Sequence, residues 1–508
     1  MRYKLICLAV IVVLLPLAFW AQGVEPPKNR CHQHLEAAEK TPCADHGDET
    51  FCTHLPLMNI VTDEPVPAPL LVDENGMWVN DEEGHRVQVN DMVGAVVQYF
   101  DSETENNHLA DEPTLEHRAL IRGRGNSSRE FDKVGYLLKF TDADMVTPLK
   151  VSLSGMTADN NWILYGPFLD KTLIRNYICY NLSGEIMDYA PNVRFCEMFL
   201  NGEYVGVYLI TEKISFNQIG RITLRKTDPD MATTSYIVQA DRGARDAAFD
   251  LTTFGNYTYS TVSAKEGYSQ LEVIYPGATL TPAQREFIEN DLSTFERALF
   301  SFDYNDPDKG YTQYIDVGSF IDYFLINEFT LNYDALSYST YLYKDVGDRL
   351  KLCVWDFNSA FDYFNYSVVS PETFQMQSLM WYQILFKDQA FVERVERRYH
   401  ALRERFFNEK YMFAYIDETL AYLGEAIDRN YEKWGYSFQS VHNGKGYDFL
   451  YPAERNVRSF DEAVAQLKEC ISRRIEHMDS NLERLYILCH QSMNKEYNYD
   501  TVKKGQLR

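Results

Sequence analysis

The sequence has few basic residues for its length, and this shortage limits the partners that it can bind. Its 508 residues include 49 Lys and Arg against 74 Asp and Glu, so the formal net charge at pH 7 is −25. Binding to a nucleic-acid backbone requires clustered basic side chains, and the sequence has no basic stripe. We therefore expect no nucleic-acid partner. Apolar residues form 45% of the chain, which is enough for a large core and argues against a disordered chain.

Long apolar runs are also missing, except at the N-terminus. Arg2 and Lys4 precede an apolar stretch over 5–20, and a small-residue, polar segment follows it. This order is typical of a signal peptide, here 1–22, and predicts a secreted, periplasmic or cell-surface protein. A stretch of about 16 residues is short for a spanning helix of about 20, and an uncleaved anchor is the alternative. No cysteine follows the stretch, which argues against a lipid anchor.

The cysteines are consistent with export. Of the nine, Cys7 lies in the predicted signal, and the even number that is left suits disulfides in an oxidising compartment. One candidate pair is Cys179 with Cys196, although sequence does not fix the connectivity. A zinc site near the N-terminus is the alternative, but the spacing matches no standard finger. Three cysteines lie in the polar extension at 23–54, namely Cys31, Cys43 and Cys52.

Apolar periodicity divides the rest of the chain into two parts. Residues from about 55 to 280 form short runs between turn residues, which predicts strands, with one helix over 170–187. Asn201-Gly202 between two apolar runs predicts a tight hairpin. Helical spacing dominates from 281 to 487, apart from a β-rich stretch at 339–356. We expect an α+β protein with helices at 282–300, 316–331, 375–408, 410–432 and 456–487, and a polar tail at 488–508.

Two aspartates in the helix-rich part carry the most informative pattern. Asp334 lies in the loop after the predicted helix 316–331, and Asp356 ends the β-rich stretch 339–356. A hairpin between them would bring the two carboxylates to neighbouring loops. In phosphoryl transfer, one aspartate receives or orients the proton of the acceptor hydroxyl and another holds Mg²⁺ on the nucleotide. The ordinary alternative is that both aspartates cap or turn the chain.

The strand-rich part contains residues that suit phosphate binding. The loop RGRGNSS at 122–128 can direct backbone N–H groups and guanidinium groups at phosphate oxygens, although Gly-Arg-Gly is also a plain turn. Lys139 lies in an apolar strand eleven residues later, where a lysine is either solvated or a nucleotide ligand. Glycine loop, strand lysine, helix, hairpin and two aspartates follow one another as in a kinase.

Several segments together resemble the family of spore-coat-protein-H-type (CotH) kinases over about residues 55–485. The resemblance implies an atypical protein-kinase-like fold with two lobes, a strand-rich N-lobe and a helix-rich C-lobe. It also implies ATP and Mg²⁺ or Mn²⁺ as cofactors, and Ser or Thr of a secreted, surface or coat protein as the acceptor. The matching segments are 122–128, 170–182, 199–214, 319–334, 339–345, 354–362, 381–403 and 467–482.

The resemblance assigns roles to individual residues. It implies Asp334 as the catalytic residue and Asp356 with Asn358 as metal ligands. The implied nucleotide-binding residues are Lys139, Arg122, Arg124, Ser127, Arg175 and Glu212.

Two departures leave the activity open. Asn358 replaces the aspartate that often closes the family's Trp-Asp-Phe-Asp turn, and an amide is a weaker ligand for a hard cation. Ser339 stands where a conventional kinase has a metal-binding asparagine. A catalytically weak or inactive binding protein of the surface or coat is therefore the second hypothesis. A secreted carbohydrate-active hydrolase, with Glu328 and Asp334 as paired carboxylates, is the third.

Overall fold

The computed structural model has a mixed α+β fold, as the sequence predicts. It describes residues 30, 32–41, 51–74, 77–81, 85–217, 224–241, 247–255, 270–361 and 370–489. The expected signal peptide, Cys31, Cys43 and residues 490–508 of the tail lie outside these ranges. Among the residues that are described, no helix is both long enough and apolar enough to cross a membrane.

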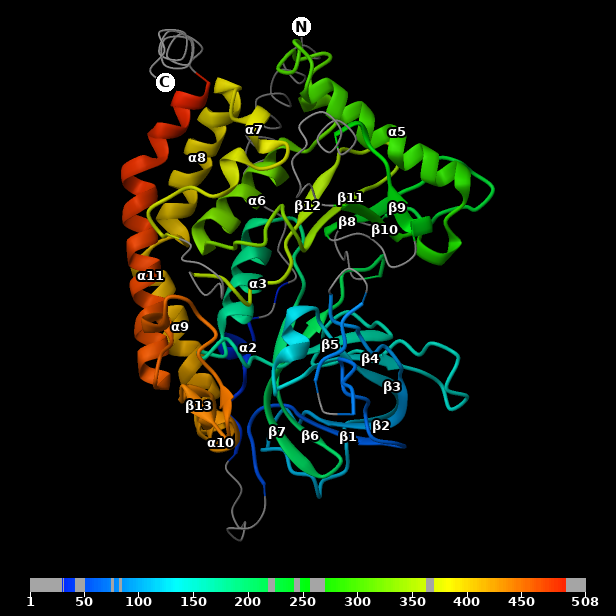
Figure 1. Ribbon diagram of the computed structural model, residues 1–508, viewed down its shortest axis with the longest axis vertical. Coiled ribbons are helices and arrows are strands. Elements are labelled where there is room, and N and C mark those ends of the chain that lie inside the picture. Colours follow the sequence, from blue (N-terminus) through cyan, green and yellow to red (C-terminus); the bar gives the residue numbers. More distant parts are fainter. Residues whose placement is uncertain are drawn as a thin grey trace, which may run out of the picture.

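Seven strands of the first half close into a barrel, which lies in the lower part of Figure 1. The order is β1-β2-β3-β4-β5-β7-β6, and the barrel closes where β1 pairs in parallel with β6. The sequence predicts strands here but not their closure, because the closing pair joins segments that are far apart in the chain. The strands are β1 (Leu57–Thr62), β2 (Val93–Phe100), β3 (Leu115–Arg124), β4 (Gly135–Phe140), β5 (Asn161–Tyr165), β6 (Val193–Leu200) and β7 (Glu203–Glu212).

Successive side chains along each strand point alternately into the barrel and out from its outer wall. Ile121, Leu138 and Trp162 belong to the apolar cluster that fills the barrel, so its interior is a packed core. Leu137 and Ile163, one residue away, belong instead to the large cluster outside the barrel. The outer wall of β4 and β5 thus packs against the rest of the molecule, including α3 (Arg175–Ile186).

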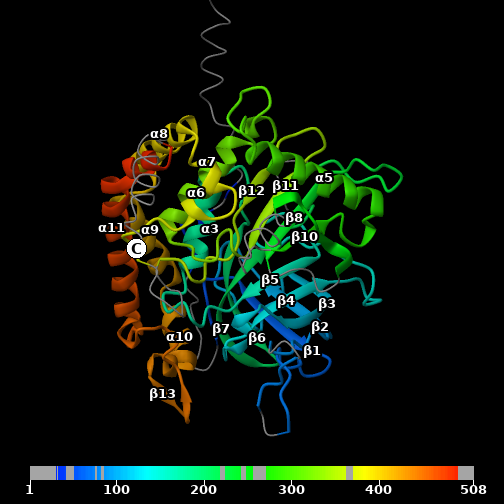
Figure 2. The ribbon, with the colours of Figure 1, turned by 45° about the horizontal axis from the view of Figure 1, so that its top comes forward.

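A second sheet of five antiparallel strands lies between the barrel and helix α5 (Pro282–Leu299) (Figures 1 and 2). Its order is β12-β11-β8-β10-β9. A capping box between Thr281 and Gln284 starts α5, because each residue satisfies a backbone N–H of the other. The strands are β8 (Tyr236–Asp241), β9 (Asp250–Leu251), β10 (Gln270–Tyr275), β11 (Thr340–Lys344) and β12 (Lys351–Cys353).

The remaining helices form a flank that runs beside this sheet and continues along the barrel, where α10 (Glu425–Trp434) lies next to β7 (Figures 1 and 2). Two predicted helices are each broken into shorter ones. Asp388 caps the start of a new helix and interrupts the predicted helix 375–408, while Gly424, with φ of +47°, interrupts 410–432. The helices are α6 (Val317–Thr330), α7 (Tyr382–Leu385), α8 (Gln389–Arg405), α9 (Glu409–Leu423), α10 (Glu425–Trp434) and α11 (Phe460–Asn481), besides the short α2 (Gln33–Glu36).

The structure corrects the proposed pairing of Cys179 with Cys196. Both thiols are free and fully buried. Cys179 lies in the cluster outside the barrel, whereas Cys196 lies in the cluster within it, so the barrel wall separates them. Burial raises the pKa of both thiols, which keeps them protonated and unreactive.

Candidate active site

Asp334 lies in a loop whose backbone is held in an unusual conformation. The loop joins α6 to β11, and its Leu331, Leu336 and Ser339 all have positive φ. Thr340 fixes the loop, because its hydroxyl oxygen accepts the N–H of Leu336 at 2.8 Å. Non-glycine residues with positive φ are costly and gather at functional sites. This loop is therefore a reasonable place for the predicted catalytic carboxylate, which is half-buried.

Helix α3 supports the turn that carries Asp356. Asp356 follows β12 with φ of +59°, and its N–H donates to the hydroxyl of Tyr180 at 2.9 Å. The next N–H, that of Phe357, donates to Oδ1 of Asn176 at 2.9 Å. Both acceptors belong to α3. The helix thus fixes the backbone on each side of the predicted metal ligand.

Arg175 also supports this turn, from within a buried ion pair. Its Nε donates to the carbonyl oxygen of Ala360 at 3.0 Å, and its Nη1 lies 2.5 Å from Oδ1 of Asp170. Both charged side chains are fully buried. Arg175 thus contacts Asp170, which precedes α3, and Ala360, which follows the Asp356 turn. Its predicted contact with phosphates stays a prediction.

The cations predicted to bind phosphate share the outer wall of the barrel. In the register of β3 with β4, Arg122 lies opposite Leu137 and Lys139 opposite Leu120, while Ile121 points into the barrel. Arg124 lies two residues beyond Arg122 and therefore on the same face. The structure brings these three predicted residues together on one surface.

Lys213, which sequence reasoning missed, joins these cations. Burial lowers the pKa of Lys213, and the charges of Lys139, Arg124 and Arg122 lower it further. Each of these three cations is thus close enough to Lys213 to repel it. The alternation of β7 could have indicated this position, because Lys213 continues the outward-facing series of Leu209 and Thr211.

One of these cations, Arg124, lies near the part of the molecule that carries Asp356. Burial and the charge of Asp356 raise the pKa of the Tyr180 phenol, while the charge of Arg124 lowers it. Burial likewise raises the pKa of Tyr341 on β11, and Arg124 opposes this shift. Arg124 and Asp356 thus act on the same phenol. A barrel cation and the predicted metal ligand meet around Tyr180.

The other predicted residues have different surroundings. Glu212 is buried at the end of β7 and accepts the N–H of Asn192 at 2.8 Å, and burial raises its pKa. Oδ1 of Asn358 accepts the hydroxyl of Ser359 at 3.1 Å. Ser127 begins a short 3₁₀ turn, and its side chain lies outside the described part of the structure. Their predicted roles therefore remain predictions.

The side-chain oxygens of Asp356 and Asn358 are suitable ligands for a metal ion that is also bound to phosphate. Mg²⁺ in such sites takes one or two protein carboxylates and completes its shell with phosphate oxygens and water. Within the described ranges, no three His, Cys, Asp or Glu side chains converge to hold a metal by themselves. The carboxylate of Asp356 with the amide oxygen of Asn358 has the donor type that a hard cation prefers.

Glu328 does not provide the open carboxylate that a hydrolase needs. It is fully buried in an ion pair with Arg474, whose Nη2 lies 2.6 Å from Oε2 of Glu328. The N–H groups of Gln375 and Met376 also donate to this carboxylate. A glycosidase requires both carboxyl groups to face the sugar. Glu328 is enclosed, so the pair with Asp334 is not available for that chemistry.

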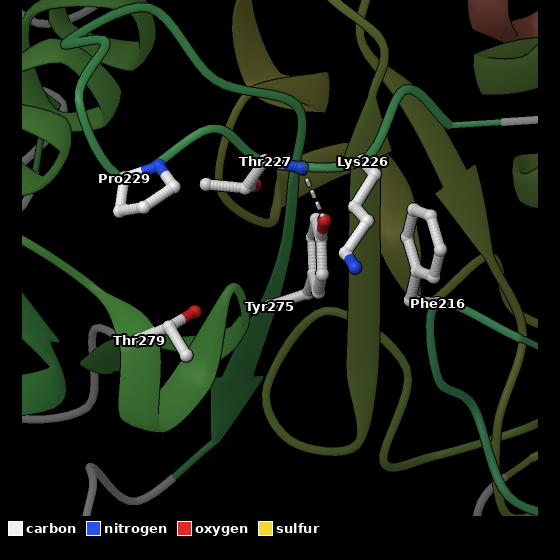
Figure 3. Close-up of a pocket in the computed structure, with 6 residues that line it drawn as sticks. All are labelled: Phe216, Lys226, Thr227, Pro229, Tyr275 and Thr279. Atoms are coloured by element: carbon white, nitrogen blue, oxygen red, sulfur yellow. Dashed lines mark hydrogen bonds between the residues drawn. The ribbon is translucent and has the colours of Figure 1, made fainter.

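A pocket of about 270 Å³ lies beside the segment that leaves β7 (Figure 3). The rings of Phe216 and Tyr275 stack at 4.5 Å between centroids, and the N–H of Thr227 donates to the Tyr275 hydroxyl at 2.7 Å. None of the predicted site residues lines this pocket. It is separate from the residues that surround Tyr180.

Clustered cations facing an aspartate turn on an α+β scaffold are typical of proteins that bind phosphorylated ligands. Comparison with protein families matches residues 121–478 to the family described as CotH kinase protein, and the chain belongs to this family. The match includes all nine predicted site residues and confirms the resemblance seen in the sequence. Membership supports a kinase-like function. Among curated proteins, no match is found.

Proposed function

We propose that this protein is an exported protein kinase that transfers the γ-phosphoryl group of ATP to Ser or Thr of a secreted, surface or coat protein. One observation supports this most strongly: Tyr180 accepts the N–H of Asp356 at 2.9 Å and also lies within the electrostatic reach of Arg124, one of the barrel cations. Phosphoryl transfer depends mainly on positioning and on charge stabilisation. Cations that bind the phosphates and a nearby carboxylate that binds a metal ion would supply both the positioning and the charge stabilisation.

In this proposal the fold has two kinase-like lobes. The barrel is the N-lobe, and the second sheet with its helices is the C-lobe. Asp356 and Asn358 would hold Mg²⁺ or Mn²⁺, which neutralises charge on the phosphates. Arg122, Arg124 and Lys139 hold the phosphate chain. Family membership and the positions described above support these roles.

Asp334 serves as the catalytic carboxylate. It accepts the proton of the substrate hydroxyl while the hydroxyl oxygen bonds to the γ-phosphorus. The bond from the γ-phosphorus to the bridging oxygen breaks, and ADP leaves. The positive-φ loop around Asp334 fixes where this carboxylate is presented.

Export is part of the proposal and rests on the apolar stretch after Arg2 and Lys4.

A second candidate function is a surface or coat binding protein without activity. One observation favours it: Oδ1 of Asn358 already accepts the Ser359 hydroxyl, which further weakens this amide as a metal ligand. Transfer activity separates the two candidates.

The test is intact-mass measurement of the purified mature chain after incubation with ATP and Mg²⁺ or Mn²⁺, with and without a generic protein acceptor. Gains of about 80 Da, one phosphoryl group, are expected for the wild type and absent from Asp356→Ala and Asp334→Ala. The matched control is Asp348→Ala, an exposed aspartate at the tip of the same hairpin. No transfer, with nucleotide binding retained, would favour the binding protein.

A further inference from the structure

Lys213 lies in a row of residues that crosses three strands of the barrel wall. Lys139 on β4 pairs with Asn161 on β5, and Trp162 pairs with Glu212 at the end of β7. Stepping one residue along this antiparallel register places Lys213 opposite Asn161. Lys139 and Lys213 therefore flank Asn161 on the outer wall. The two lysines belong to one surface, although 74 residues of sequence separate them.

Arg122 donates to Oδ1 of Asn90 at 2.9 Å, but the other three cations of this surface are poorly compensated. The described residues give no hydrogen bond or ion pair to the charged ends of Arg124, Lys139 or Lys213. The acidic group near Lys213 is Asp159, whose charge raises the pKa of that lysine. Burial, Lys139 and Arg124 each lower this pKa more strongly, so the pKa of Lys213 is lowered overall. The Asp159 carboxylate is already used by the hydroxyl of Ser215 at 3.1 Å and by a backbone N–H.

An excess of positive charge is unusual on this chain, whose net charge is −25. Half-buried cations without counter-ions destabilise the free protein, because solvent screens them incompletely. A bound polyanion removes that repulsion. A short, multiply charged ligand suits the site best, because the cations are confined to one patch of the barrel wall rather than forming a stripe.

We propose that Lys213 is a phosphate ligand, the fourth cation of the site formed with Arg122, Arg124 and Lys139, and that it contacts the phosphate chain of the nucleoside triphosphate. This inference rests on the proposed function, because it assumes that the nucleotide binds at this wall. It adds a residue outside both the glycine-containing loop and the strand lysine that the sequence indicates. Lys213 is also the first residue after β7, so a bound nucleotide would contact the start of the segment that leaves the barrel.

The test measures binding of ATP, ADP and adenosine by calorimetry to the mature chain in the presence of Mg²⁺. Loss of one charged hydrogen bond is expected to weaken ATP binding about tenfold to a hundredfold in Lys213→Met. Adenosine binding should not change, and Lys213→Arg should restore most of the ATP affinity. Lys150→Met is the matched control, because Lys150 is exposed nearby and donates to Asn217 at 2.7 Å.

Thermal unfolding of the same variants separates a ligand-binding role from a structural one. Without nucleotide, Lys213→Met should unfold at the same temperature as the wild type or higher, because an uncompensated cation has been removed. With ATP, it should gain less stability than the wild type. A lower melting temperature without nucleotide would overturn the proposal, because Lys213 would then act as the structural partner of Asp159.

Comparison with the other cations distinguishes failure of this inference from failure of the proposed function. If Arg124→Met and Lys139→Met weaken ATP binding but Lys213→Met does not, Lys213 is not a ligand and the proposed function stands. If none of the three substitutions changes ATP binding, the nucleotide does not bind at this wall, and both proposals fail. Weakened binding of ATP and adenosine alike in Lys213→Met would also reject a phosphate contact.

Discussion

The buried ion pair of Asp170 and Arg175 allows a quantitative test of how the Asp356 turn is held. Neither side chain is exposed, and Asp170 also accepts the backbone N–H groups of Thr172 at 3.0 Å and of Arg175 at 2.9 Å. Removing one partner of a buried pair strands the other charge, which typically costs about 3–5 kcal/mol. We expect Asp170→Ala to lower the free energy of unfolding by this amount.

Urea unfolding followed by tryptophan fluorescence measures this loss. The control is Asp63→Ala, because Asp63 forms an ion pair with Arg118 at the same 2.5 Å separation but in an exposed position. Solvent screens an exposed pair, so this control should change stability little. The two ion pairs have the same separation, so the difference in stability measures burial together with the backbone hydrogen bonds that Asp170 also accepts.

The double variant tests the cause. Adding Arg175→Met to Asp170→Ala removes the stranded charge, so the double variant should be more stable than Asp170→Ala alone. The reasoning is wrong if Asp170→Ala costs no more than Asp63→Ala, or if the double variant recovers nothing. Nucleotide affinity should fall in the double variant, because it lacks the Arg175 Nε that donates to the carbonyl oxygen of Ala360.

Three further predictions use other parts of the molecule. Arg474→Met strands the buried Glu328 carboxylate and should cost about 3–5 kcal/mol in urea unfolding, whereas Arg473→Met, at an exposed pair, should cost little. Tyr180→Phe removes the acceptor of the Asp356 N–H and should weaken Mg²⁺-dependent nucleotide binding about fivefold, about 1 kcal/mol, in calorimetry; unchanged binding would show that the turn needs no such support. Burial and Lys139 lower the pKa of Lys213, and its protonated form binds phosphate, so ATP affinity is full below that pKa and falls as the pH rises through it. Lys213→Arg should flatten this profile in titrations between pH 7 and 10 (about the ordinary lysine value), and an equal slope in both proteins would reject the prediction.

Short-range patterns in the sequence predicted most elements correctly. Asn201 and Gly202 both have positive φ, as the two-residue hairpin turn requires, and this turn lies between β6 and β7. The predicted helices 282–300 and 316–331 match α5 and α6 closely. These features depend on residues close together in the chain, so local periodicity and turn chemistry are sufficient to predict them.

Helix ends were predicted less well, although local signals exist. Gly424 could have marked the break between α9 and α10, and Asp388 the start of α8. The apolar spacing continues across both breaks, which is why two long helices were predicted. Capping residues interrupt a helix without interrupting its apolar face.

Patterns in the amino-acid sequence were enough to predict the family, the types of most elements, and the residues that suit phosphate and metal. The folded chain was needed to show that β1 and β6 close a barrel and that Arg175 supports the Asp356 turn from a buried pair with Asp170. It also decided that Lys213 joins Lys139 on one wall. The reason is physical: charge interactions and burial depend on distance in space, and residues far apart in the sequence become neighbours only when the strands pair and the core closes.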